Sequence, residues 1–355
     1  MPLTLQAGAV PFSAAGLTPA WLETALGLKD IAEVAAEPLG AERGFVGQTF
    51  RVSYRLDGRR TAETVVVKLP AASPRARASL APLRYGEREA RFYTELAANS
   101  PLATAQCHHA ALDPATGDAV LVLQDLGDGD PGDDLEGCPP DQATRLVRQL
   151  GAFHARHWNA PPAGHPWLPR FDEDQPDRYY DVLWRRMKHR HADVIPPAFV
   201  AIGDRLGREL AAFRARLAAP PLTITHGDLR TDNLVFYSGR VVVLDWQVIA
   251  WARGPLDLGY FLTQSFAPDI RRAFEAELLS AYHRALVDGG APGYALEACR
   301  DDMRLGCLQN AATFVLAGGS LDFTGDRARA LLHVTLERIT AAVADWQPFD
   351  LLARG

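Results

Sequence analysis

The pattern of apolar and polar residues predicts a β-hairpin early in the chain. Residues 50–56, FRVSYRL, and residues 61–69, TAETVVVKL, are rich in β-branched and aromatic side chains. Asp57 and Gly58 lie between these two runs and suit a tight turn. This part of the protein is therefore expected to be rich in β-structure.

Three more elements are expected around this hairpin. A short helix is predicted over residues 18–27, because Thr18 can cap its start and Gly27 can end it. A longer helix is predicted over residues 83–98, and residues 119–126, AVLVLQDL, have the apolar run of a buried strand.

The second half of the chain has mainly the pattern of helices. Apolar residues fall on one helical face at 141–158, and helical patterns return at 178–190, 197–217 and 255–345. A second hairpin, over residues 234–246, interrupts them.

This order of elements predicts an α+β protein with two lobes. A small, β-rich N-terminal lobe is expected over residues 1–126, and a larger, mainly helical lobe over residues 127–355. The loop at 127–141 is rich in Gly, Pro and Asp, and we expect it to be a solvated junction between them. The alternative is an acidic rim that attracts a cationic substrate.

Composition narrows the class of protein. The chain has 355 residues, of which 48% are hydrophobic and 23% charged, as in soluble globular proteins. Its formal net charge of -6 argues against nucleic acid as the main partner. None of the 4 cysteines forms a CxxC pair, so neither a zinc site nor a disulfide framework is indicated. With no secretory signal and no membrane-spanning run visible, a cytoplasmic protein is expected.

The strongest chemical signal is THGDLRTDNLVFYSGRVVVLDWQ, residues 225–247. If Ser238-Gly239 is a two-residue turn, Asn233 and Asp245 are diagonal neighbours at one end of the hairpin. An amide oxygen and a carboxylate placed in this way suit Mg²⁺. Asp228 lies on a His-Gly-Asp turn five residues before Asn233 and adds a second carboxylate.

These residue types match the needs of phosphoryl transfer. A carboxylate must orient the attacking hydroxyl group and accept its proton, and metal ligands must hold the cations that neutralise the phosphates. The spacing Asp-x4-Asn, followed by an Asp at a strand end, is that of the catalytic loop and metal site of protein-kinase-like enzymes. The alternative is that these three residues merely cap turns and end a strand.

HGDLRTDN followed by LDWQ resembles the aminoglycoside phosphotransferase and choline kinase-like family. Together with GPLDLGYFL and YGEREARFYTEL, it is most similar to the bacterial phosphotransferase and ecdysteroid-kinase-like branches. The likeness runs over roughly residues 40–265 and is specific at 225–260. It implies a two-lobed protein-kinase-like fold, ATP and Mg²⁺ as cofactors, Asp228 as catalytic base, and Asn233 and Asp245 as metal ligands.

The resemblance also implies a lysine that binds the α- and β-phosphates and a glutamate that holds this lysine. Lys68 ends the strand TVVVKL in a chain where only three of 37 basic residues are lysine. Glu89 is its partner by the E-x-x-F-Y pattern of the family. Glu87 is the competitor, on a different side of the helix.

The remaining nucleotide contacts are expected in two segments. The loop over the phosphates corresponds to residues 44–47, with Gly44 and Gly47, and Gln48 follows it. This loop departs from GxGxxG, so an ordinary turn is an equal alternative. LVLQDL matches the hinge strand of the family, whose backbone at Gln124–Leu126 is expected to contact the adenine.

Several polar residues near the motif have more than one interpretation. Arg230 is expected to contact the γ-phosphate, or else to form a salt bridge to Asp232. His226 is interpreted as a brace of the catalytic loop, and Asp257 as a helix cap or a second brace of that loop. The pair HxxH that begins at His154 has no apparent third metal ligand, so a core histidine is expected there.

The sequence thus predicts an ATP-dependent kinase that phosphorylates a hydroxyl group of a small molecule. The alternative is a catalytically silent pseudokinase or nucleotide-binding regulator. A protein kinase is disfavoured, because GPLD follows Asp245 too closely to leave a peptide-positioning segment. The identity of the acceptor and the oligomeric state are left open.

Overall fold

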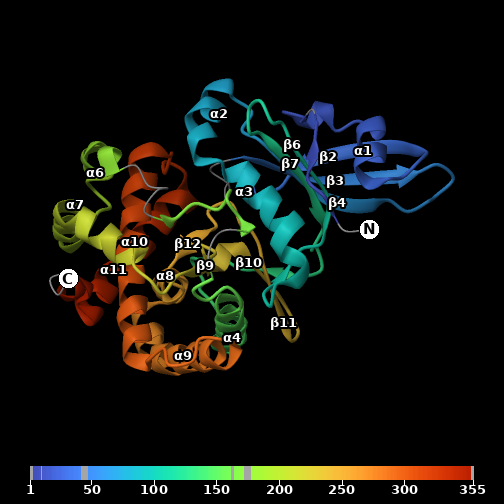
Figure 1. The fold of residues 1–355 in the computed structure, drawn as a ribbon. Helices are drawn as coiled ribbons and strands as arrows, with labels where there is room; N and C mark the ends of the chain where they lie inside the picture. Colours follow the sequence, from blue (N-terminus) through green and yellow to red (C-terminus); the bar gives the residue numbers. More distant parts are fainter. Residues whose placement is uncertain (1–2, 9, 41–46, 161–163, 172–176, 353–355) are drawn as a thin grey trace. The chain divides into compact units, whose positions relative to one another are not determined.

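The computed structural model describes residues 3–8, 10–40, 47–160, 164–171 and 177–352. Within it the chain forms two compact units. Unit 1 contains residues 1–130 and 242–248, and unit 2 contains residues 131–241 and 249–355. We describe each unit by itself (Figure 1).

Unit 1 is built on a six-stranded sheet in the order β1-β6-β7-β4-β3-β2. The neighbours are antiparallel except for the short β1, which pairs in parallel with β6. The strands are β1 (Gln6–Ala7), β2 (Ile31–Pro38), β3 (Gln48–Leu56), β4 (Glu63–Leu69), β6 (Cys107–Leu112) and β7 (Ala119–Gln124). The hairpin expected at the Asp57-Gly58 turn is confirmed as β3 and β4, whereas β2 and β6 were not predicted.

One face of this sheet packs on the N-terminal part of the chain. Helix α1 (Pro19–Leu26) is capped by the Thr18 hydroxyl and ends at Gly27, whose φ of 68° is left-handed, as its sequence predicts. Leu22 of this helix joins a buried cluster with Val65 and Val67 of β4. Because side chains alternate along a strand, Lys68 leaves the sheet on the opposite face.

The helix expected over residues 83–98 is less regular than its pattern predicts. It begins as α3 (Tyr85–Arg91), continues as a π-helix over Phe92–Leu96 and ends as a 3-10 turn over Ala97–Asn99. A second short helix, α2 (Pro74–Leu80), precedes it.

Residues 242–248 belong to unit 1, although the sequence placed the whole of 127–355 in the second lobe. Two contacts account for this difference. The end of β11 (Arg240–Val243) pairs in parallel with β5 (Ala103–Thr104), and the Trp246 ring stacks on Phe92 at a centroid distance of 3.7 Å. Both contacts link residues far apart in the sequence, so no local pattern reveals them.

Unit 2 is mainly helical, as predicted. Its longer helices are α4 (Pro140–Arg156), α6 (Asp177–Arg190), α7 (Pro197–Ala218), α8 (Pro255–Ser265), α9 (Pro268–Gly289), α10 (Leu296–Ser320) and α11 (Asp326–Trp346). The short strands β9 (Thr223–Thr225) and β12 (Ala250–Ala252) pair antiparallel beside them. The predicted α+β class is therefore confirmed. None of the helices in the described ranges is long and apolar enough to cross a membrane.

Helices α8 and α10 approach so closely that glycine is needed at the crossing. A Cβ atom on Gly306 of α10 would lie 2.7 Å from Gly259 Cα and 2.7 Å from the Leu256 carbonyl oxygen of α8. Such contacts are shorter than any backbone can accept, so the two helices must separate if either glycine gains a side chain. Every residue of α8 is buried, and this crossing helps to fix its position.

We expect Gly306→Ala to lower the free energy of unfolding by about 2 kcal/mol, the usual cost of overpacking a core. Urea denaturation followed by circular dichroism measures this change. Gly164→Ala is the control, because a Cβ there meets nothing within 4 Å. Equal stabilities of the two variants would contradict the close helix crossing.

Candidate active site

Lys68, at the end of β4, forms ion pairs with two carboxylates inside unit 1. Its ammonium nitrogen lies 2.7 Å from Glu89 Oε1 on α3 and 3.0 Å from Asp245 Oδ1. Glu89 is buried, whereas about a quarter of the Lys68 and Asp245 side chains is exposed. The three charges therefore lie together at a site that solvent still reaches.

Of the two glutamates that the sequence leaves open, Glu89 is the one that contacts Lys68. Glu87 points elsewhere and pairs with Arg84 and Arg91, each at 2.8 Å. Residues two apart on a helix face different directions, so only one of the two glutamates can reach the strand.

The pKa values follow from this arrangement. Burial alone would lower the pKa of Lys68, but Asp245 and Glu89 outweigh it and raise that pKa above its ordinary value. Burial raises the pKa of Glu89, although Lys68 partly offsets this effect. Lys68 is therefore held as a cation, the form that attracts phosphate.

Asp245 occupies a strained backbone position. Its φ is 64°, in the left-handed region that a non-glycine residue rarely adopts. Its Oδ2 accepts a hydrogen bond from Gln247 Nε2 at 3.3 Å, and the next residue, Trp246, stacks on Phe92. Such strain is often found where a side chain must be aimed at a ligand.

In unit 2, the His-Gly-Asp turn is held by the buried carboxylate of Asp257 on α8. The backbone N–H groups of His226 and Gly227 donate to its two oxygens at 2.6 and 2.9 Å. Gly227 has a φ of 84°, which a side chain would disfavour. The prediction that Asp257 braces this loop is confirmed.

His154 supports the same carboxylate and is not part of a metal site in the described residues. Its Nε2 lies 3.2 Å from Asp257 Oδ2, and its Nδ1 lies 2.7 Å from the Tyr282 hydroxyl. The ring is fully buried. The expectation of a core histidine is therefore confirmed.

Asp228 receives three hydrogen bonds within unit 2. Tyr260 donates its hydroxyl hydrogen to Oδ1 at 2.9 Å. Asn233 Nδ2 and Arg230 Nε donate to Oδ2 at 3.1 and 3.3 Å. Asn233 Nδ2 also donates to the Asp228 carbonyl oxygen at 2.9 Å. These bonds fix the carboxylate, of which about a fifth remains exposed.

Arg230 is committed to carboxylates in this structure. Its Nη1 lies 2.6 Å from Asp134 Oδ2 and 3.0 Å from Asp232 Oδ2. The ion pair with Asp232, which the sequence offered as the alternative, is present. Burial would lower the pKa of Arg230, but Asp228, Asp134 and Asp232 outweigh it and raise that pKa well above its ordinary value. A contact with a γ-phosphate stays a prediction.

The composition of the acidic loop after residue 127 predicted that it is solvated, but the structure buries part of it. Asp134 is fully buried against Arg230, and Asp133 lies 2.8 Å from Arg327 Nη1. Arg327 also reaches Asp232 at 2.9 Å. Burying a carboxylate is costly unless a cation compensates it, and two distant arginines supply that charge.

The expected phosphate loop is only partly described. Gly44 lies outside the described residues. Gly47 lies against β4, where a Cβ would be 2.8 Å from the Leu69 carbonyl oxygen. Gln48 Nε2 donates to the carbonyl oxygens of Phe12 and Pro70 at 3.0 and 2.8 Å, so this amide braces the N-terminal segment.

The expected hinge segment, residues 121–126, covers the end of β7 and the two residues that follow it. The Gln124 N–H donates to the Gln106 carbonyl oxygen at 2.7 Å, and the Leu126 carbonyl oxygen accepts from Gly129 N–H at 2.8 Å. Arg51 of β3 clamps this segment through a bidentate ion pair with Asp125, at 2.8 and 3.2 Å. Contact of Gln124 or Leu126 with a nucleotide base stays a prediction.

Sequence reasoning missed Tyr260 and Asp134. Tyr260 follows Asp257 by three residues on α8, so both face the catalytic loop, and this helical spacing was a usable signal. Asp134 had no such signal, because its partner Arg230 lies almost a hundred residues away.

The sequence was compared with models of known protein families. Residues 44–296 match the model of a family described as the phosphotransferase enzyme family. The chain belongs to this family. A search of curated protein sequences gave no significant match.

Solved kinase structures share the fold of this phosphotransferase. A microcompartment-associated aminopropanol kinase is 14% identical, with a TM-score of 0.55 over 92% of this chain and 97% of its own. A choline kinase from Streptococcus pneumoniae is also 14% identical, with a TM-score of 0.53 over 90% and 97%. An amicoumacin kinase in complex with AMP-PNP and Ca²⁺ is 12% identical, with a TM-score of 0.53 over 93% and 94%.

The donor atoms of the phosphotransferase fit a hard cation only in part. Because Asn233 Nδ2 donates to Asp228, its amide oxygen turns away from that residue, and Asp245 supplies carboxylate oxygens. No cluster of three or more His, Cys, Asp or Glu forms a metal site in the described residues. Mg²⁺ commonly takes its remaining oxygens from phosphates and water, so an amide oxygen and a carboxylate are suitable partial ligands for it.

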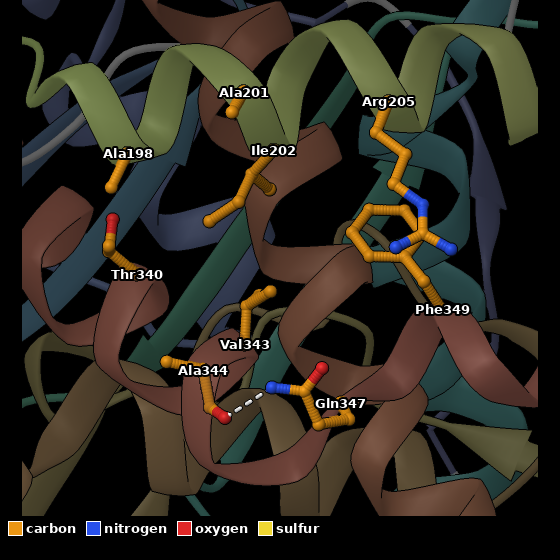
Figure 2. Close-up of a pocket in the computed structure, with 9 residues that line it drawn as sticks. All are labelled: Ala198, Ala201, Ile202, Arg205, Thr340, Val343, Ala344, Gln347 and Phe349. Carbon is orange, nitrogen blue, oxygen red and sulfur yellow. Dashed lines mark hydrogen bonds between the residues drawn. The ribbon is translucent and has the colours of Figure 1, made fainter.

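A hollow between α7 and α11 lies apart from these residues (Figure 2). Its volume is about 280 Å³, just below the usual range of small-molecule pockets. The Arg205 guanidinium lies 4.3 Å from the centre of the Phe349 ring at one end. No residue of the predicted site lines it.

We expect Asp257→Asn to lower the free energy of unfolding by roughly 2 kcal/mol, because one amide group cannot accept from both buried backbone N–H groups. Chemical denaturation measures the loss, and Asp288→Asn, an exposed aspartate near the end of α9, is the control. Two variants of equal stability would show that Asp257 does not hold the loop.

Proposed function

We propose that this phosphotransferase moves the γ-phosphate of ATP to a hydroxyl group of a small molecule. The observation that carries the proposal is the shared ion pair of Lys68 with Glu89 and Asp245. Phosphoryl transfer needs a fixed cation for the phosphates and a carboxylate for the metal. Family membership supports the same chemistry.

Lys68 binds the α- and β-phosphates in this proposal. An ammonium group held between two acids stays protonated, and it can turn from Asp245 toward phosphate while Glu89 keeps its position. Gly44, Gly47 and Gln48 are proposed to lie over the nucleotide, and the backbone at Gln124–Leu126 to contact its base. ATP is proposed as the nucleotide on the family resemblance alone.

Mg²⁺ would be held by Asn233 and Asp245, with phosphate oxygens completing its shell. The metal would neutralise negative charge on the β- and γ-phosphates. The chain's own part is to present two hard oxygen donors. The AMP-PNP and Ca²⁺ complex of the similar amicoumacin kinase makes a divalent cation the natural first choice.

Asp228 is the proposed base. It orients the acceptor hydroxyl group and takes its proton as the oxygen attacks the γ-phosphorus, while the bond to the β-phosphate oxygen breaks and ADP leaves. The three hydrogen bonds to Asp228 support this role, because they hold the carboxylate in one orientation before the acceptor binds.

Arg230 is proposed to have two roles, to neutralise buried carboxylates and to contact the γ-phosphate. It neutralises Asp134 and Asp232 and so allows the loop to be buried. A contact with the γ-phosphate would require the guanidinium group to give up one of these partners.

The acceptor is proposed only as a small molecule with a hydroxyl group. Two similar structures are kinases of aminopropanol and of choline, which both combine a hydroxyl group with a nitrogen atom. Amino alcohols therefore come first in a test panel, followed by amino sugars, sugars and steroids.

We expect wild-type protein to release ADP from ATP in the presence of one class of acceptor. The rate should fall by ~10²-fold or more in Asp228→Ala, since a positioned base contributes 10²–10⁴. Chelation of divalent cations should abolish the activity and added Mg²⁺ should restore it. Nucleotide binding without turnover for any acceptor would favour a regulator instead, and no binding at all would refute the proposal.

We expect Glu89→Gln to weaken the binding of Mg·ATP about tenfold, because Lys68 loses the charged hydrogen bond that positions it. Isothermal titration calorimetry measures the dissociation constant. Glu87→Gln is a matched control on the same helix, since Glu87 pairs only with arginines in the contacts described above. Equal affinities of the two variants would argue against the Lys68 site.

A further inference from the structure

Tyr260 makes a hydrogen bond to the proposed base. It lies on α8, is 2% exposed, and its hydroxyl group donates to Asp228 Oδ1 at 2.9 Å. Other buried tyrosines in unit 2 donate elsewhere. Tyr180, for example, donates to the Gly203 carbonyl oxygen at 3.0 Å. The Tyr260 hydroxyl group donates instead to the proposed base, Asp228.

The two oxygens of Asp228 differ in their surroundings. Oδ2 accepts two hydrogen bonds, from Arg230 and Asn233, which fill its two lone pairs. Among the residues that the structure describes, Oδ1 accepts one hydrogen bond, from Tyr260. One lone pair on Oδ1 is therefore left to accept the hydrogen of a further hydroxyl group.

Tyr260 cannot itself take that hydrogen. Burial, and then the charge of Asp228, raise the pKa of Tyr260 well above its ordinary value. The phenol group stays protonated and is a hydrogen-bond donor at any working pH. It can orient the carboxylate, but it has no vacant basic site comparable to that of Asp228.

We propose that Tyr260 is a positioning residue for phosphoryl transfer, and that Asp228 receives the acceptor's proton on Oδ1, the oxygen that Tyr260 holds. This assignment rests on the proposed function. In the step, the O–H bond of the acceptor breaks and its proton moves to Oδ1. The acceptor oxygen bonds to the γ-phosphorus, the bond to the bridging oxygen breaks, and ADP leaves with that electron pair. The proton then passes to solvent.

The position of Tyr260 is set by the same helix that holds the loop. Asp257, one turn earlier on α8, accepts from the backbone N–H groups of His226 and Gly227. One helix thus fixes both the backbone of the turn and the side chain that follows it. A displacement of α8 would move the loop and Tyr260 together and keep their mutual geometry.

The test is Tyr260→Phe, which keeps the buried ring and removes the hydroxyl group. With the acceptor found in the panel, we expect kcat to fall about tenfold while KM for ATP changes by less than about twofold. Tyr180→Phe is the matched control, because it removes a buried hydroxyl group that touches neither Asp228 nor its partners. We expect its kcat to equal that of wild type, with a similar loss of thermal stability in both variants.

A kcat of Tyr260→Phe within twofold of wild type would overturn the assignment, and so would an equal loss in Tyr180→Phe. A crystal structure of the unliganded wild-type protein tests the contact without turnover. A Tyr260 oxygen within about 3 Å of Asp228 supports the assignment, and one beyond about 4 Å refutes it. If the contact is present but no acceptor is phosphorylated, the failure lies in the proposed function.

Discussion

The buried carboxylate of Asp257 is the contact on which the candidate site of unit 2 depends. It accepts hydrogen bonds from the backbone N–H groups of His226 and Gly227. A buried N–H group without an acceptor costs a large fraction of the stability of a protein, so the turn keeps its shape only with this carboxylate in place. His154 and Tyr282 in turn fix the carboxylate. Asp228, the proposed base, directly follows the turn that these residues hold.

In each unit, one cation pairs with several carboxylates of the candidate site. Lys68 is shared by two acids, and about a quarter of its side chain remains exposed. Arg230 is shared by three acids and is mostly buried. Its positive charge compensates carboxylates whose burial would otherwise be costly.

The sheet of unit 1 separates packing from chemistry by the alternation of side chains. Val65, Val67 and Leu69 of β4 join the core beneath α1, and Lys68 faces the other way. The stacking of Trp246 on Phe92 brings the segment 242–248 into the same unit and carries Asp245 to Lys68. This aromatic contact lies directly next to Asp245, whose backbone has a positive φ.

The sequence by itself determined the α+β class, the hairpin of β3 and β4, the helices of unit 2 and the motif around Asp228, because each depends on local period or spacing. It also indicated Glu89, but could not exclude Glu87, since both are glutamates on one short helix. The strands β2 and β6 were missed. The tertiary structure alone decided which charged groups meet: Asp134 with Arg230, and Asp245 with Lys68. The two ion pairs join residues 96 and 177 positions apart, and contacts over such distances arise from packing, which no local pattern encodes.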